Sequence, residues 1–228
     1  MEKKSAMADS IRESTVEEFR GAVASGQPMP AGVSASAVSA SFALGLAAKV
    51  LEVSGSRKDF AGDRSKLRAL LATAQSESQR MVRFAEDDIA AFHAYIAAVR
   101  LPHATVSEQQ ERARAIASAV RVAIDVPLGA AQAAAAGIAL CADAAGMAHP
   151  GVAADLGAAA ALLAGALRVF ILCADSNVQQ LPSGSASDEA AGSGRRAWET
   201  KAFRQADSVL QQVEAAIHAK RKTETSKS

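Results

Sequence analysis

Alanine supplies most of the apolar surface of this chain, and this bias restricts the folds available to it. Half of the 228 residues are hydrophobic, yet aromatic residues make up only 4%. Alanine is the best helix former and loses no side-chain entropy on folding, so the composition favours closely packed helices over sheet. We therefore predict an all-α protein, a single multihelical domain of close-packed, Ala-rich antiparallel helices with a sizeable core.

Capping signatures and helix breakers divide the chain into predicted helices. Thr15 followed by Glu18 is a capping box that opens a short helix to about residue 24, and prolines and glycines at 26–32 follow it. Further helices are predicted at about 34–53, 62–99, 107–145, 152–179 and 195–220. Ser107 and Gln110 form a second capping-box match, and Pro127 is expected to kink or break its helix near 125–126.

The predicted domain spans residues 14–221, between a flexible N-terminus at 1–13 and a polar tail at 222–228. A segment of loop composition at about 182–194 is predicted to be a flexible link.

The charge balance excludes some classes of partner. The formal net charge is +1, which gives no electrostatic reason to expect nucleic acid or an anionic membrane. The N-terminus has no apolar core typical of a signal peptide. The stretch at 151–174 resembles a membrane span but contains Asp155 and Arg168, so a buried helix of a soluble protein is expected. We expect a cytoplasmic protein in which Cys141 and Cys173 are buried free thiols, with a disulfide as the alternative.

Asp88 is the residue that the helical pattern singles out. It lies in an otherwise apolar stripe, at three- and four-residue steps, formed by Met81, Phe84, Asp88, Phe92, Tyr95 and Val99. A carboxylate buried without a partner is costly, so Asp88 should be paired, hydrogen-bonded or shifted in pKa. A structural ion pair or an exposed position is the alternative to a functional role.

Other polar residues give weaker signals. Asp155 falls in the first turn of its predicted helix, where the helix dipole favours a negative charge, and this alone accounts for it. Arg168 is the lone cation of an apolar helix, and an ion pair with a buried acid or a substrate carboxylate would explain it. The four histidines lack metal-site spacing, and no nucleotide-binding or hydrolase-elbow motif is present, so no metal site is predicted.

Several of these landmarks together resemble the cyclodeaminase/cyclohydrolase family, which comprises bacterial methenyltetrahydrofolate cyclohydrolases and the cyclodeaminase half of formimidoyltransferase-cyclodeaminase. The resemblance covers roughly Val16 to Gln180 in matching order and spacing. It rests on a proline–glycine loop before a small-residue helix (28–34), a basic stretch (56–60), D-x-x-A-F (88–92) with Leu101-Pro102, A-x-x-V-P-L (123–128), a polar turn (149–157), and Arg168 with Asn177.

The chain also departs from the family's polar motifs. The glycine loop keeps only Gly32, and the substituted positions are Phe60 for tyrosine, His149, Gly151 and Cys173 for asparagines, and Ala154 for serine. The retained polar residues are Lys58, Asp88, Asp155, Arg168 and Asn177.

The resemblance implies folate one-carbon chemistry: hydrolysis of the methenyl bridge of 5,10-methenyltetrahydrofolate to 10-formyltetrahydrofolate. It implies Asp88 as the base beside the cationic bridge, and Lys58 orienting it or holding the folate's glutamate tail. Binding roles follow for Gly32, Ser34, Arg168 and Asn177, with Asp155 facing the pterin.

The resemblance implies no metal and no cofactor beyond the tetrahydrofolate substrate. It also implies a homodimer, for which the small-residue helix Ser34–Val53 suits close packing. The alternatives are cyclodeamination of formimidoyltetrahydrofolate, another pterin or one-carbon substrate, and a degenerate homologue that binds folate or a protein partner without turnover.

Overall fold

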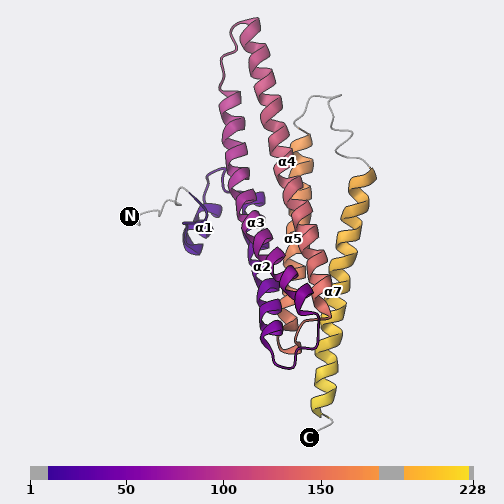
Figure 1. Cartoon of the computed structure of the whole chain (residues 1–228). Helices are drawn as coiled ribbons and strands as arrows, with labels where there is room; N and C mark the ends of the chain where they lie inside the picture. Colours follow the sequence, from indigo (N-terminus) through magenta and orange to yellow (C-terminus); the bar gives the residue numbers. More distant parts are fainter. Residues whose placement is uncertain (1–9, 180–192, 226–228) are drawn as a thin grey trace. The chain divides into compact units, whose positions relative to one another are not determined.

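Every regular element of the described residues is helical, as the composition predicts. A computed structural model describes residues 10–179 and 193–225, with side chains of the second range described over 199–215 (Figure 1). The elements are α1 (Val16–Val23), α2 (Gly32–Ser56), α3 (Arg64–Val99), α4 (Val106–Ala145), the 3₁₀ turn η1 (Pro150–Val152), α5 (Ala153–Val178) and α7 (Ser193–Thr225). The predicted helices match these bounds within a few residues, and no strand lies in the described ranges.

The structure describes parts of both predicted ends of the domain. Residues 10–13, in the segment predicted to precede the domain, form a turn in which Ile11 is buried and Ser10 Oγ donates to Glu86. Helix α7 continues to Thr225, so residues 222–225 are helical where a polar tail was predicted. Most of the predicted link at 182–194 lies outside the described residues, since α7 begins at Ser193.

The capping predictions are right for α1 and misplaced for α4. In α1, the Thr15 N–H donates to Glu18 Oε2 at 2.7 Å and the Glu18 N–H donates to Thr15 Oγ1 at 3.2 Å. At α4 the same reciprocal pair is made by Thr105 and Glu108, at 2.8 and 3.2 Å, and not by Ser107 and Gln110. The helix therefore starts at Val106, one residue earlier than predicted. Thr105 and Glu108 form the reciprocal hydrogen bonds of a capping box, which satisfy N–H groups that have no partner within the helix.

Pro127 does not break α4. The helix runs without interruption from Val106 to Ala145 with the proline inside it, and the Pro127 side chain is fully buried. The missing proline N–H therefore leaves a carbonyl four residues earlier without its helical donor, which matters for the site described below.

Contacts between residues divide the chain into two compact units. The helices α2, α3, α4 and α5 each contribute one part of their length to the first unit and the other part to the second. The first unit contains residues 10–38, 82–131 and 168–179 of the described chain, and the second contains 39–81, 132–167 and 193–225. Each is described by itself.

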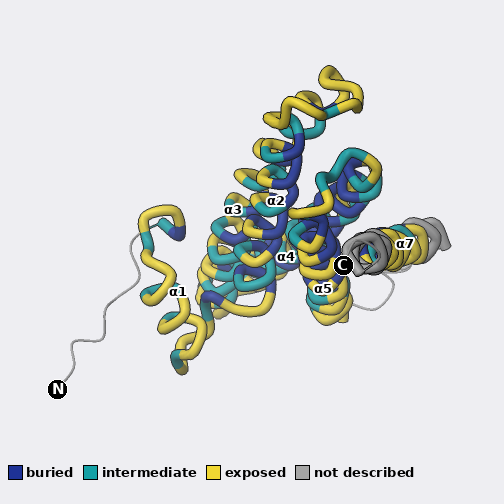
Figure 2. Tube along the Cα trace, turned by 90° about the horizontal axis from the view of Figure 1, so that it is seen from below, coloured by how far each residue is buried: buried dark blue, intermediate teal, exposed yellow. Residues whose placement is uncertain are grey.

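Both units have cores built on small side chains, so helix backbones approach closely (Figure 2 marks the buried residues in dark blue). In the second unit, Ala40, Ala43 and Ala47 are fully buried on α2. A Cβ added to Gly137 of α4 would lie 3.1 Å from both Leu44 and Leu163, which shows how little space separates the helices there. In the first unit Phe170 is the largest fully buried side chain.

Three helical segments are long and apolar enough to cross a membrane by length and composition alone. They are Gly32–Ser56, Val106–Ala145 and Pro150–Val178, of which the sequence analysis had noted only the last. About half of each apolar window (50, 56 and 50%) is buried inside the protein.

Candidate functional site

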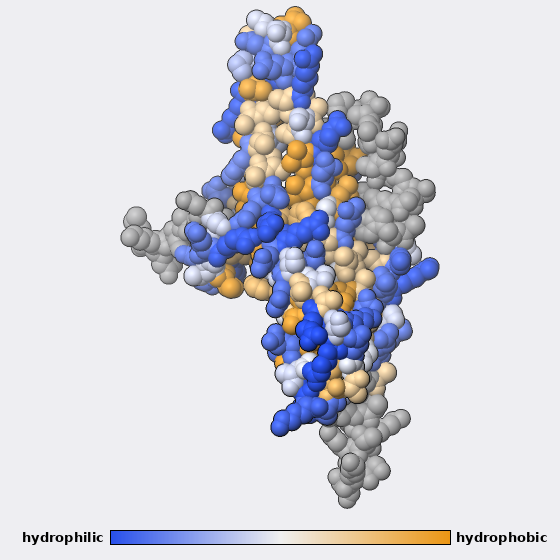
Figure 3. Space-filling model, viewed as in Figure 1, coloured by the Kyte–Doolittle hydropathy of each residue, from blue (hydrophilic) through white to orange (hydrophobic). Residues whose placement is uncertain are grey.

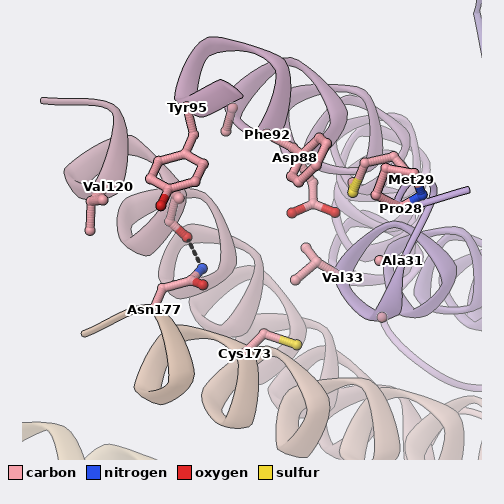
Figure 4. Close-up of a pocket in the computed structure, with 13 residues that line it drawn as sticks. Pro28, Met29, Ala31, Val33, Asp88, Phe92, Tyr95, Val120, Cys173 and Asn177 are labelled. Atoms are coloured by element: carbon pink, nitrogen blue, oxygen red, sulfur yellow. Dashed lines mark hydrogen bonds between the residues drawn. The ribbon is translucent and has the colours of Figure 1, made fainter. Parts of the chain in front are cut away.

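A pocket of about 280 Å³ lies in the first unit, where α3, α4, α5 and the start of α2 meet (Figure 4). Its walls are mostly apolar, with a few polar groups among them. The lining residues are Pro28, Met29, Ala31, Gly32, Val33, Asp88, Ala91, Phe92, Tyr95, Val120, Ala123, Cys173 and Asn177. An apolar cavity of this size with few convergent polar groups is the usual form of a small-molecule site.

The start of α2 forms one wall of this pocket. The Ala35 N–H bonds to the Ala31 carbonyl at 2.9 Å, which places the first helical turn directly after the proline-rich loop. The N–H groups of Gly32, Val33 and Ser34 therefore have no acceptor within the helix, and the positive end of the helix dipole faces the cavity. A Cβ on Gly32 would meet Cys173 Sγ at 3.5 Å, an ordinary contact, so space alone does not require glycine there.

Asp88 lies beside this helix start, half-buried on α3. Ser34, which is fully buried, donates from its Oγ to Asp88 Oδ2 at 2.8 Å and makes a longer contact of 3.3 Å with the Ala85 carbonyl. Burial raises the pKa of the Asp88 carboxyl above its ordinary value of 3.8, and hydrogen bonds from the side chain and backbone of Ser34 oppose that rise. The predicted hydrogen-bonded, pKa-shifted acid is therefore present.

The charge of the pocket comes from one group. Among the described residues that line it, Asp88 is the only carboxyl group and there is no basic side chain; Tyr95, Cys173 and Asn177 supply the other polar side chains. In a cavity of low dielectric, an uncompensated carboxylate favours a cationic ligand strongly.

Asn177 completes the far wall. Its Nδ2 donates to the backbone carbonyl of Ala123 at 2.7 Å, shown by the dashed line in Figure 4. Asn177 and Gly32 are predicted binding residues that the structure places in the same pocket as Asp88, and Ser34 joins them through its hydrogen bond.

Cys173 also faces the pocket, where a fully buried thiol was expected. Both cysteines are free, as predicted, with Cys141 buried and Cys173 half-buried. Burial raises the pKa of the Cys173 thiol, and the charge of Asp88 raises it further. The thiol therefore remains protonated beside the acid. It is neutral, as is the asparagine side chain found at this position in the family. Burial raises the pKa of Cys141 to about 12.

Three predicted site residues do not line this pocket. Lys58 is exposed in the second unit, directly after α2. Asp155 lies in the first turn of α5 and forms an ion pair with Lys49 at 2.7 Å, which accounts for it structurally. Arg168 belongs to the first unit and is exposed on α5, away from the residues that line the pocket.

A second pocket, of about 220 Å³, lies in the second unit between the α2–α3 loop and the α4–η1 turn. It brings together the basic stretch at 56–60 and the polar turn at 149–151, through Arg57, Asp59, Phe60 and His149. Arg57 donates to Asp59 at 3.0 Å, and that hydrogen bond lowers the pKa of the Asp59 carboxyl. The charged groups here are thus largely satisfied by one another.

Backbone contacts fix this second pocket. His149 Nδ1 accepts from the Gly151 N–H at 3.1 Å, and the His149 N–H donates to Ser54 Oγ at 2.9 Å. Arg64 donates to the Gly55 carbonyl at 2.6 Å while its guanidinium lies 5.3 Å from the centre of the Phe60 ring. The hydrogen bonds and ring contact of His149 and Arg64 therefore stabilise the α2–α3 loop and the α4–η1 turn.

Several residues that line the first pocket were not predicted as site residues from the sequence: Pro28, Met29, Phe92, Tyr95 and Val120. Phe92 and Tyr95 were already part of the stripe around Asp88, so the stripe was a signal that could have identified these two residues. No signal in the sequence pointed to Val120.

Comparisons with known proteins agree with this architecture. The formiminotransferase-cyclodeaminase family model matches residues 15–192. A methenyltetrahydrofolate cyclohydrolase of Methylorubrum extorquens is 31% identical over 114 residues, which is 50% of this chain and 55% of the relative. The chain thus spans about half the length of this curated relative.

A solved structure supports the fold. The crystal structure of a formiminotetrahydrofolate cyclodeaminase from Thermotoga maritima superposes with a TM-score of 0.75, covering 92% of this chain and 98% of that one. At 17% identity this likeness shows the fold alone. Since the family model matches well over half of the chain, this protein belongs to the formiminotransferase-cyclodeaminase family.

Proposed function

We propose that this protein is a 5,10-methenyltetrahydrofolate cyclohydrolase whose catalytic base is Asp88. The observation that carries the proposal is the lone carboxylate in a largely apolar pocket, held by Ser34 at 2.8 Å. The methenyl bridge is an amidinium cation, so the pocket and the substrate have complementary charges. The family of the chain and the printed activity of its M. extorquens relative support the same chemistry.

The reaction needs one proton acceptor. Water adds to the bridge carbon as Asp88 accepts one of its protons, which gives a neutral adduct with a hydroxyl on that carbon. N5 then takes up a proton as its bond to the carbon breaks, and the hydroxyl loses its proton to become the formyl carbonyl on N10, so that one proton is released overall. A raised pKa makes the carboxylate a better base than a solvated aspartate, while the substrate cation favours its ionised form. The Ser34 hydroxyl orients the carboxylate throughout. We propose that no metal, nucleotide or cofactor beyond the folate takes part.

The proposal is tested by the loss of the methenyl absorbance at neutral pH in the presence of a chelator. Wild type is expected to accelerate the loss over buffer and Asp88→Asn is expected to abolish the acceleration. Asp87→Asn is the matched control, since Asp87 is the adjacent acid and is exposed. If Asp88→Asn is as active as Asp87→Asn, Asp88 is not the base; if wild type equals buffer, the chain is not a cyclohydrolase.

A binding protein without turnover is the second candidate. It is favoured by the positions of Lys58 and Asp155, which do not line the Asp88 pocket. Calorimetry with tetrahydrofolate separates the two: tight binding with no loss of the methenyl form identifies a binder. Parallel assay with formimidoyltetrahydrofolate, measuring released ammonia, tests the cyclodeaminase alternative.

We further propose a cytoplasmic homodimer in which a second copy covers an apolar face of the second unit. Lys49 pairs with Asp155, and Leu44 and Leu163 both contact the position of Gly137, so α2 and α5 lie antiparallel there. Phe42 on α2 and Leu162 on α5 are 57% and 44% exposed, and Figure 3 shows apolar surface among the polar residues.

Exposed apolar side chains on helices this rich in small residues suit close packing of a second copy. Light scattering should show a dimer for wild type and a monomer for Phe42→Glu. Val106→Glu is the control, because Val106 is 70% exposed at the start of α4. A monomeric wild type, or a dimer that Phe42→Glu leaves intact, would contradict this face.

A further inference from the structure

Pro127 withholds one hydrogen-bond donor from the middle of α4. In an α-helix the N–H of residue i bonds to the carbonyl of residue i−4, and proline has no N–H. The carbonyl deprived of its donor is therefore that of Ala123, which is also a wall of the Asp88 pocket. Ala123 is half-buried, so its carbonyl is only partly open to water, and another protein donor compensates for the missing N–H.

Asn177 of α5 supplies that donor. Its Nδ2 lies 2.7 Å from the Ala123 carbonyl oxygen. A carbonyl only accepts, so the amide must present its NH₂ to Ala123, and the flipped orientation would set two oxygens against each other. One N–H of Nδ2 is committed in this way, which fixes the orientation of the amide and leaves its oxygen Oδ1 available as an acceptor to the cavity that Asn177 lines.

We propose that Pro127 is a positioning residue, which reserves the Ala123 carbonyl for Asn177 and thereby fixes Asn177 Oδ1 as a hydrogen-bond acceptor for the bound ligand. A valine or alanine at 127 restores the N–H, which takes the Ala123 carbonyl into the helix ladder. That N–H competes with Asn177 for the Ala123 carbonyl, so the anchor of Asn177 weakens and its amide can present either face. The fixed acceptor selects ligands that carry N–H donors, as the aminopyrimidine ring of a pterin does.

The inference deepens the proposed function and rests on it for the identity of the ligand. It does not make Pro127 catalytic, since Pro127 itself is not a lining residue. The expected signature is a binding defect: KM for the methenyl substrate rises about 3- to 10-fold, the size of one net hydrogen bond, while kcat changes little.

A double-mutant cycle tests it on the whole chain. Pro127→Val, which keeps most of the buried volume and adds the N–H, should raise KM as much as Pro127→Ala does. In the Asn177→Ala background, Pro127→Val should have no further effect, because the residue through which it acts is gone. Additive effects of the two changes would overturn the inference, and so would an unchanged KM in Pro127→Val.

A second readout is independent of turnover, and it separates failure of this inference from failure of the proposed function. In NMR spectra of uniformly labelled protein, the Asn177 side-chain NH₂ should show slowed hydrogen exchange in wild type and fast exchange in Pro127→Val. If the NH₂ is equally protected in both, Pro127 does not position Asn177, whatever the enzyme does. If protection is lost but wild type hydrolyses no methenyl substrate, only the proposed function fails.

Discussion

The carboxyl groups of the two pockets have pKa values shifted in opposite directions. In the first unit, Asp88 faces apolar walls and receives only the hydrogen bonds of Ser34, so burial raises its pKa. In the second unit, Asp59 is exposed and is paired with Arg57, which lowers its pKa. Both pockets are formed by segments that resemble family motifs, yet only the first holds an acid whose charge still needs a partner. Two segments that both resemble family motifs therefore hold carboxylates in different electrostatic environments.

The largest expected difference between the pockets lies in activity. Asp88→Asn should lower kcat/KM for the methenyl substrate by about 100-fold or more, because general-base catalysis contributes about 10²–10⁴-fold. Asp59→Asn should stay close to wild type, since its charge is already compensated. Steady-state kinetics by absorbance measure both variants. Equal losses of kcat/KM in Asp88→Asn and Asp59→Asn would show that the two carboxylates do not differ in their contribution to activity.

The pH dependence sharpens the same contrast. Hydrogen bonds from Ser34 lower the pKa of Asp88, so Ser34→Ala should raise it. The base must be ionised to act, and activity is lost as pH falls through its pKa, so the acidic limb of the kcat/KM profile should move to higher pH. Ser54→Ala is the matched control, a buried serine of the second unit that contacts His149. A limb that stays in place in Ser34→Ala contradicts the assigned role.

Thiol reactivity measures the charge of Asp88 directly. That charge helps to raise the pKa of Cys173, so Asp88→Asn should lower this pKa and increase the thiolate fraction at pH 8. Alkylation of Cys173 by iodoacetamide, followed by mass spectrometry, should therefore be faster in Asp88→Asn than in wild type. Cys141, buried with a pKa of about 12, is the internal control and should stay unmodified. Slower or unchanged alkylation of Cys173 would place Asp88 outside its electrostatic reach.

The smallest expected effect is on stability without ligand. The folded-state pKa of Asp88 is above its ordinary value of 3.8, so the folded protein binds more protons between the two pKa values and loses stability as pH rises through them. Asp88→Asn should therefore melt higher than wild type at pH 7, on a scale of about 2–4 °C per kcal/mol for a chain of this size.

The same gain should shrink as pH falls through the folded-state pKa of Asp88, because the protonated carboxyl is then as neutral as the amide that replaces it. Calorimetric scans at pH 7 and pH 4 measure it, with the exposed Asp87→Asn as a control. A lower Tm for Asp88→Asn at pH 7 would show that the ionised carboxylate is stabilised by the fold.

The helices and their ends were largely predictable from sequence, because caps, prolines and small-residue runs act locally. Thr15 with Glu18 shows this, and the misplaced cap at α4 shows its limit, since two adjacent candidates compete and only geometry decides. Asp88 was predictable because an acid in an apolar stripe is a conflict visible along one helix. The hydrogen bond of Asn177 to the Ala123 carbonyl and the position of Cys173 beside Asp88 were not predictable, because these partners come from distant segments. Asp155 and Lys49 form a pair 106 residues apart, which no local pattern reveals.

The alanine-built core determines how this chain tolerates mutation. A buried leucine can lose volume and leave a cavity, but a buried alanine such as Ala43 or Ala159 has almost nothing to lose. Nearly every substitution at such a position adds atoms where neighbouring backbones already meet, and added methylene groups force helices apart. Random variation in this protein should therefore fail mainly by steric expansion, and its tolerated core changes should be serine or glycine.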